Sequence, residues 1–181
     1  MPFLIESFVY ILFFALIFGV VKRTSTIELL LIITALTTVT IGEALNLFVY
    51  KATAYTARIG IPIYIILGGS IIAWSYFKLP QILSKKIRKN NPAMQIVLFL
   101  FLSALFPVIE IAGIKAGLWY WLKAYSITSL WWWIGVWKFY MLFLGIPVLT
   151  ALTYVSAKNY LKKIILTLTY LRKNKEGGFY G

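Results

Sequence analysis

The chain has 181 residues, 61% of them hydrophobic, and a mean hydropathy of +0.87, whereas soluble domains contain roughly 45–50% apolar residues. A soluble fold of this size has no room to bury so much apolar surface, so we predict an integral membrane protein. The absence of Cys and His excludes disulfides, thiol nucleophiles, Cys/His metal sites and Ser-His-Asp catalysis. The net charge of +13 comes from basic residues between hydrophobic runs, a pattern typical of membrane loops rather than of nucleic-acid binding.

Five apolar runs are long enough to cross a bilayer, which needs about 20 helical residues. In chain order they are Phe3–Val21, Ile27–Tyr50, Ile59–Phe77, Ala93–Ile114 and a span within Trp131–Ala157. The last span is expected to start near Trp137, because Trp131–Trp133 suit the membrane interface. Gly117–Val136 is then an outer interfacial loop or a re-entrant piece, and a sixth short span is the alternative. The predicted fold class is all-α, a polytopic membrane bundle of about five transmembrane helices.

The basic residues also predict the topology. With the first loop, the third loop and the tail on one side, that side holds 13 of the 18 Lys and Arg residues. The positive-inside rule then places the N-terminus outside and the C-terminus inside a cell membrane. Residues 1–157 form the transmembrane bundle, and residues 158–181 form either a basic amphipathic helix or a disordered tail. We expect anionic headgroups to contact Lys85–Lys89 and Lys158–Lys175.

Two hairpins carry the same order of features: a Glu late in one span, an aromatic residue after it, and Gly-Ile-Pro at the next span. The first copy is Glu43, Tyr50 and Gly60-Ile61-Pro62, and the second is Glu110, Trp119 with Trp121, and Gly145-Ile146-Pro147. Because both hairpins cross the membrane in the same direction, this order predicts a parallel two-hairpin repeat. Chance is the alternative, since Gly-Ile-Pro is a short motif.

Glu43 and Glu110 are the candidate catalytic residues. Each is an acid within an apolar run, where a charged side chain costs at least about 2.5–3.5 kcal/mol and normally faces the bundle interior. We expect the two carboxyls to face one cavity, where an acid that stays protonated can act as a general acid. The alternative for both is a structural role, as a hydrogen-bond or ion-pair partner of a neighbouring helix.

Polar and aromatic residues near the two acids are the candidate substrate-binding residues. They are Asn46, Tyr50, Trp119, Trp121 and Tyr125. We expect residues from Trp119–Trp133 to roof the cavity, because aromatic faces stabilise a positive centre. An interfacial aromatic belt is the alternative for any single ring. No metal-binding or nucleotide-binding motif is present, so neither a metal ion nor a cofactor is expected.

Residues 43–150 contain two related series of motifs. They are Glu43, Tyr50, Gly60-Ile61-Pro62 and Trp74, then Pro107-Val108-Ile109-Glu110, Gly117-Leu118-Trp119-Tyr120-Trp121 and Gly145-Ile146-Pro147. This arrangement resembles the membrane carotenoid-biosynthesis family that includes the archaeal and bacterial carotenoid hydratases. The resemblance implies a long polyene isoprenoid substrate and addition of water to a terminal double bond. The chain departs from the family pattern at Val148-Leu149, where Asn-Phe is expected, and in having Pro107 ahead of its acid.

The predicted function is that of a membrane protein acting on a long-chain isoprenoid or carotenoid-type lipid, as a cofactor-independent hydratase or isomerase. A non-catalytic accessory subunit of a membrane complex, or a small lipid or solute carrier, is the alternative. A lipid-filled cleft containing both acids favours the enzyme, a water path to both faces favours the carrier, and a solid bundle favours the subunit. The expected partner is a membrane lipid or polyene isoprenoid and not a nucleic acid, and the chain is compatible with an oligomer.

Overall fold

The computed structural model describes residues 2–45, 48–50, 62–87, 91–117, 119–121 and 129–177, with the backbone alone described at 2–3, 48–50, 119–121 and 171–177. Within these residues, five helical stretches are long and apolar enough to cross a membrane. The elements are α1 (Pro2–Lys22), α2 (Thr26–Ala44), β1 (Phe48–Tyr50), α3 (Ile63–Lys86), α4 (Pro92–Ser103), α5 (Phe106–Lys115), β2 (Trp119–Trp121), α6 (Leu130–Tyr140), the π-helical segment η1 (Met141–Gly145) and α7 (Ile146–Gly177). The predicted all-α bundle is confirmed, and the chain is a multi-pass membrane protein.

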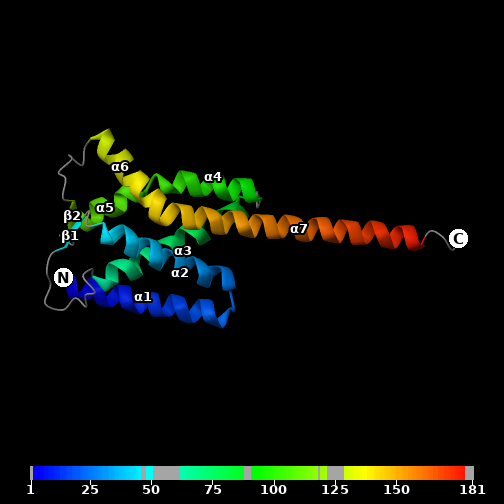
Figure 1. Ribbon diagram of the computed structural model, residues 1–181, viewed down its shortest axis with the longest axis horizontal. Coiled ribbons are helices and arrows are strands. Elements are labelled where there is room, and N and C mark those ends of the chain that lie inside the picture. The colour runs from blue at the N-terminus through cyan, green and yellow to red at the C-terminus, as the bar shows by residue number, and fades with distance from the viewer. Residues whose placement is uncertain are drawn as a thin grey trace.

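Helices α2 and α3 lie in the middle of the bundle, with α1 on one side and α4 and α7 on the other (Figure 1). The middle of their contact is apolar, since Ala35 of α2 and Ala73 of α3 are fully buried in the core. The outside is apolar too, because Phe8, Phe14 and Phe18 of α1 are 60–70% exposed. Large exposed aromatic side chains in such number suit contact with lipid rather than with water.

The fourth span, predicted over Ala93–Ile114, covers Pro92–Lys115, and it consists of two helices rather than one. Helix α4 ends at Ser103, and α5 begins at Phe106. Pro107 explains the break, because its ring lacks an N–H donor and clashes with the carbonyl group four residues back, which belongs to Ser103. As a result, Glu110 lies on a short helix that has its own direction.

The second span ends earlier than predicted. Helix α2 stops at Ala44 rather than continuing to Tyr50, and Phe48–Tyr50 forms strand β1. A short apolar run does not distinguish helix from strand, and aromatic and β-branched residues favour a strand. Strand β1 pairs antiparallel with β2, with Tyr50 opposite Trp119. The helices that carry the two candidate acids therefore each lead towards one strand of this pair.

The third span is shifted relative to its predicted range of Ile59–Phe77. Helix α3 begins after its N-cap residue Pro62 and runs to Lys86. A proline just before a helix is favourable because its restricted φ angle suits the N-terminus. The polar residues after Phe77 do not end the helix, since a helix can continue beyond the hydrocarbon layer.

The fifth span begins seven residues before the predicted start near Trp137. Ser129 is the N-cap of α6, and its side chain accepts a hydrogen bond from the backbone N–H of Trp132, a typical way to start a helix. Residues 130–136 are therefore helical rather than part of an outer loop. The helix passes through η1 into α7 without a break, and α7 then projects beyond the end of every other helix (Figure 1). Residues 158–177, which were predicted as a separate segment, continue α7.

Candidate functional site

A cavity of about 220 Å³ lies where helices α1, α2, α3, α5 and α6 meet η1. Two acids line it, and most of its other lining residues are apolar or aromatic. The lining residues are Ile5, Val9, Val39, Glu43, Tyr64, Ile65, Gly68, Gly69, Ile72, Ile109, Glu110, Phe139, Tyr140, Phe143 and Leu144. A concave, mainly apolar pocket with a few polar groups is the usual form of a small-molecule site.

Glu110 is held on its wall of the cavity by a tyrosine. Its side chain is 2% exposed, and its Oε1 atom accepts a hydrogen bond of 2.7 Å from the hydroxyl group of Tyr140. The Tyr140 ring stacks on Phe106, with ring centroids 5.3 Å apart. Helices α5 and α6 therefore fix the Glu110 carboxyl group together, one through the backbone and the other through a phenol.

Glu43 lies in the last turn of α2 and is 8% exposed. The neighbouring residue Gly42 allows close contact with η1, because a Cβ atom at this position would lie 3.1 Å from the Phe143 ring. One helical turn earlier, the hydroxyl group of Thr38 donates a hydrogen bond of 2.5 Å to the carbonyl oxygen of Phe143. These contacts hold the Glu43 end of α2 against the π-helical segment.

The π-helical segment η1 and the end of α6 supply the aromatic part of the cavity. They provide Phe139, Tyr140 and Phe143. π-Helical turns within longer helices are frequent at functional sites, because the extra residue redirects the side chains around it. These residues were not predicted from the sequence, although Gly145 and Pro147 were a signal, because glycine and proline are common where a helix is irregular.

The structure brings together the two acids that the sequence singled out, since Glu43 and Glu110 line the same cavity. Of the other predicted site residues, Asn46 and Tyr125 lie outside the described residues. Tyr50, Trp119 and Trp121 lie in the strand pair, where the backbone alone is described. Their contact with a substrate stays a prediction.

The predicted roof is partly wrong. Within the described residues, Trp131 points outward at 78% exposure, and Trp132 packs into the apolar core. The described aromatic side chains around the cavity are instead Tyr64, Phe139, Tyr140 and Phe143. The tryptophan run was misjudged because α6 begins at Leu130, so these residues lie around a helix rather than along a loop.

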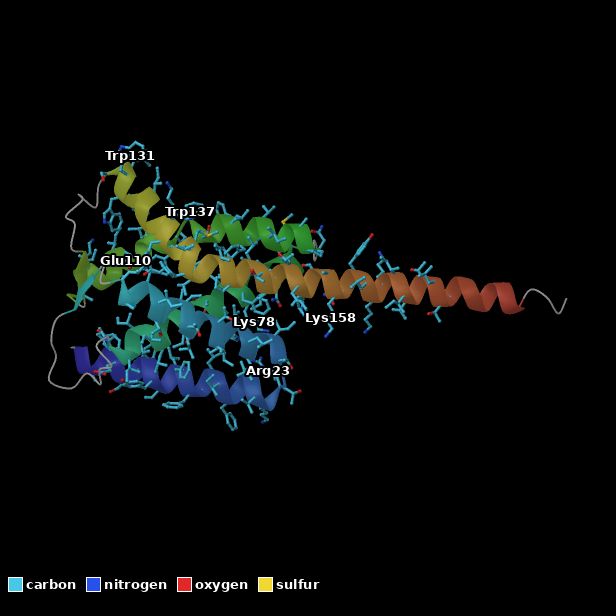
Figure 2. The ribbon with its side chains drawn as sticks, in the orientation of Figure 1. Arg23, Lys78, Glu110, Trp131, Trp137 and Lys158 are labelled. Atoms are coloured by element: carbon cyan, nitrogen blue, oxygen red, sulfur yellow. The ribbon has the colours of Figure 1, made fainter. Side chains whose placement is uncertain are left out.

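Another buried acid, Glu28, lies at the opposite end of the bundle from Glu110. Its Oε1 atom is 2.5 Å from the Lys78 ammonium nitrogen, and its Oε2 atom accepts a 2.6 Å hydrogen bond from the indole N–H of Trp74. Figure 2 places Lys78 near Arg23 and Lys158, away from Glu110 and Trp131. No cluster of three potential metal ligands occurs within the described part of the chain.

Comparison of the chain with known protein families, with curated proteins and with solved structures finds no match. The chemistry of the cavity is therefore inferred from its own geometry. A cavity that is lined by a buried carboxyl group bonded to a phenol, by a second carboxyl group and by mainly apolar surfaces can bind an apolar ligand. A protonated carboxyl group in the cavity can also transfer its proton to such a ligand.

Proposed function

We propose that this membrane protein binds a long-chain isoprenoid or carotenoid-type lipid in the cavity and protonates one of its double bonds. The observation that carries the proposal is that Glu43 and Glu110 line one cavity whose other surfaces are mainly apolar. An apolar chain gains free energy by contact with such surfaces, and burial favours the protonated, uncharged form of a carboxyl group, so that a proton is available for an alkene.

Glu110 is the proposed proton donor. Its proton adds to one alkene carbon and leaves a carbocation on the other, while the carboxyl group becomes a carboxylate. Tyr140, at 2.7 Å, stabilises that carboxylate by its hydrogen bond. Faces of the neighbouring aromatic rings stabilise the carbocation.

Glu43 is the proposed base. In a hydration, it orients a water molecule whose oxygen attacks the carbocation, and it then accepts the proton that this oxygen releases. In an isomerisation, Glu43 instead accepts a proton from the carbon next to the carbocation, and a new double bond forms. After either route, a proton passes from Glu43 back to Glu110 and restores the starting state. Both routes balance without a metal ion, a nucleotide or an oxidant, so the proposed enzyme is a cofactor-independent lyase or isomerase.

The proposed orientation is N-terminus out and C-terminus in, in a cell membrane. The end of the bundle that carries Arg23, Lys78 and Lys158 (Figure 2) is the proposed cytoplasmic side, in line with the positive-inside rule. The exposed residues Lys85 and Lys86 are proposed to contact anionic headgroups there. The cavity then lies within the outer half of the bilayer.

The test uses the full-length protein in lipid nanodiscs, with mass spectrometry of lipids that co-purify with it and with an assay on a polyene isoprenoid. We expect Glu110→Gln to lower turnover by about 100-fold or more, because the amide keeps the volume but donates no acid proton. Glu43→Gln should also lower turnover. Glu6→Gln is the matched control, since Glu6 is 4% exposed and accepts a hydrogen bond from Tyr10 but does not line the cavity.

Full activity in both Glu110→Gln and Glu43→Gln would refute the proposed enzyme. Bound isoprenoid without any turnover in the unsubstituted protein would instead assign the cavity to a lipid carrier. Loss of the folded state in both variants, measured as an absent thermal transition, would assign the two acids a structural role.

A further inference from the structure

The last helix, α7, has an exposed apolar face that no other described part of the chain covers. From Ala157 to Tyr170 every residue of α7 is exposed, and the helix extends past the other helices as a single rod (Figure 1). Residues 158–177 of a helix are about 30 Å long. Leu161, Ile164 and Leu168 are 58%, 38% and 60% exposed on this rod.

These apolar residues belong to a stripe that begins in the part of α7 that packs against the bundle. The stripe consists of Thr150, Tyr154, Ala157, Leu161, Ile164 and Leu168, and all six are exposed. Their spacing alternates between four and three residues, which is the heptad pattern of helices that pair along a seam. The opposite side of α7 carries Val148 and Leu152, which are fully buried against the chain's own bundle. The stripe therefore points away from the protein's own core.

We propose that this stripe, from Thr150 to Leu168, is the interface through which α7 pairs in parallel with α7 of a second copy of the chain. Two copies inserted the same way have parallel α7 helices that emerge on the same side of the membrane. A two-fold axis along the membrane normal then places each stripe against itself. Inside the bilayer, the small residues Thr150 and Ala157 permit close approach of the two backbones.

The stripe from Thr150 to Leu168 is uncharged, which suits contact with the same stripe of a second copy. The basic residues Lys162 and Lys163 follow Leu161 directly, which turns them away from a seam at Leu161 and Ile164. Pairing therefore buries Leu161, Ile164 and Leu168 of the stripe and leaves both lysines in water. Helices in proteins gain most of their stability from packing of an apolar face, and a partner helix supplies such packing here.

The shape of α7 argues against its lying flat on the membrane. Between Pro147 and Gly177 the sequence contains neither proline nor glycine, and α7 is one helix over this range. Sharp helix kinks almost always occur at such residues or at π-helical turns. The projecting part therefore keeps the direction of the membrane-spanning part and leaves the bilayer with it.

Cysteine cross-linking of the full chain tests the pairing, because the protein has no cysteine of its own. Leu168→Cys lies on the stripe, and Leu166→Cys is the matched control. Both leucines are about equally exposed, at 60% and 61%, but they lie about 200° apart around the helix. In membranes treated with a mild oxidant, we expect disulfide-linked dimers from Leu168→Cys and Leu161→Cys at least about five-fold more than from Leu166→Cys.

A second measurement uses two differently tagged copies of the chain in one membrane. Leu161→Glu and Leu168→Glu together should abolish their co-purification, whereas Leu166→Glu should retain it, because only the first pair places like charges in the seam. Equal cross-linking at positions 166 and 168, or none at either, would overturn the proposal. Quenching by nitroxide-labelled lipids of a fluorophore at both Leu161→Cys and Leu168→Cys, without cross-linking, would overturn it in favour of docking on the bilayer.

Discussion

The two ends of the bundle each bury a glutamate, but they surround it differently. Glu28, at the basic end, has an ion pair with Lys78, a hydrogen bond from Trp74 and a further one of 3.0 Å from Ser25. Glu110, at the other end, accepts from the uncharged phenol of Tyr140 and faces a cavity. Lys78 compensates the charge of the Glu28 carboxylate, whereas the Glu110 carboxyl group lies next to a cavity that a ligand can enter.

This difference separates an acid with a structural role from an acid that is a candidate for catalysis. A buried carboxylate with a cation and two further donors has its charge compensated, and it serves to join the helices that bring those partners. Glu28 joins α2 to α3 in this way. A carboxyl group between a phenol and an apolar cavity is available to a ligand. Three substitution pairs test the comparison, and they follow in order of expected effect.

The largest effect is expected at the basic end. Lys78→Met leaves the Glu28 carboxylate without its closest cation, and breaking a buried pair costs about 3–5 kcal/mol. The lower end of that range applies because the Lys78 side chain is 24% exposed. We expect the apparent Tm in nanodiscs to fall by about 6–12 °C, since 1 kcal/mol corresponds to about 2–4 °C for a chain of this size.

Two control variants test whether the effect of Lys78→Met comes from its ion pair with Glu28. Lys85→Met removes an exposed lysine and should change the Tm by less than about 2 °C. The double variant Glu28→Gln with Lys78→Met removes both charges and should recover part of the loss. If Lys85→Met and Lys78→Met lowered the Tm equally, Glu28 would not be a structural acid.

An intermediate effect is expected from the packing beside the cavity. A Cβ atom at Gly69 would lie 2.7 Å from the Cγ2 atom of Val39, whereas at Gly68 the nearest atom, in Val9, is 4.0 Å away. Gly69→Ala should therefore cost about 1–3 kcal/mol by overpacking, and the Tm should fall by about 2–12 °C. Gly68→Ala, one residue earlier, should leave the Tm nearly unchanged. Equal Tm values for the two variants would mean that the α2 wall of the cavity is as loosely packed as the α1 wall.

The five membrane spans could be predicted from the sequence, because apolar runs favour lipid and charged loops favour water. The helix ends were harder to predict. Pro107 breaks α4 from α5 and Ser129 starts α6, but each acts through one local contact that hydropathy does not detect.

The acids of the site were predictable and their neighbours were not. Glu43 and Glu110 stand out because a carboxyl group is costly inside an apolar run. Tyr140 and Phe143 are two of many aromatic residues, and only the turn of η1 brings them to the cavity. Glu28 was not singled out because its partner Lys78 is 50 residues away along the chain.

The smallest of the three effects is expected at the contact that holds η1 in place. The hydroxyl group of Thr38 donates to the carbonyl oxygen of Phe143, and Thr38→Val keeps the side-chain shape but removes this donor. A single hydrogen bond contributes about 0.5–1.5 kcal/mol, so the Tm should fall by about 1–6 °C. Thr40→Val is the control, because the exposed Thr40 donates only to the Leu36 carbonyl oxygen of its own helix. If η1 positions the cavity residues, Thr38→Val should also weaken lipid retention in the nanodisc assay while Thr40→Val does not. Unchanged lipid retention in Thr38→Val together with a lowered Tm would restrict this contact to a role in stability.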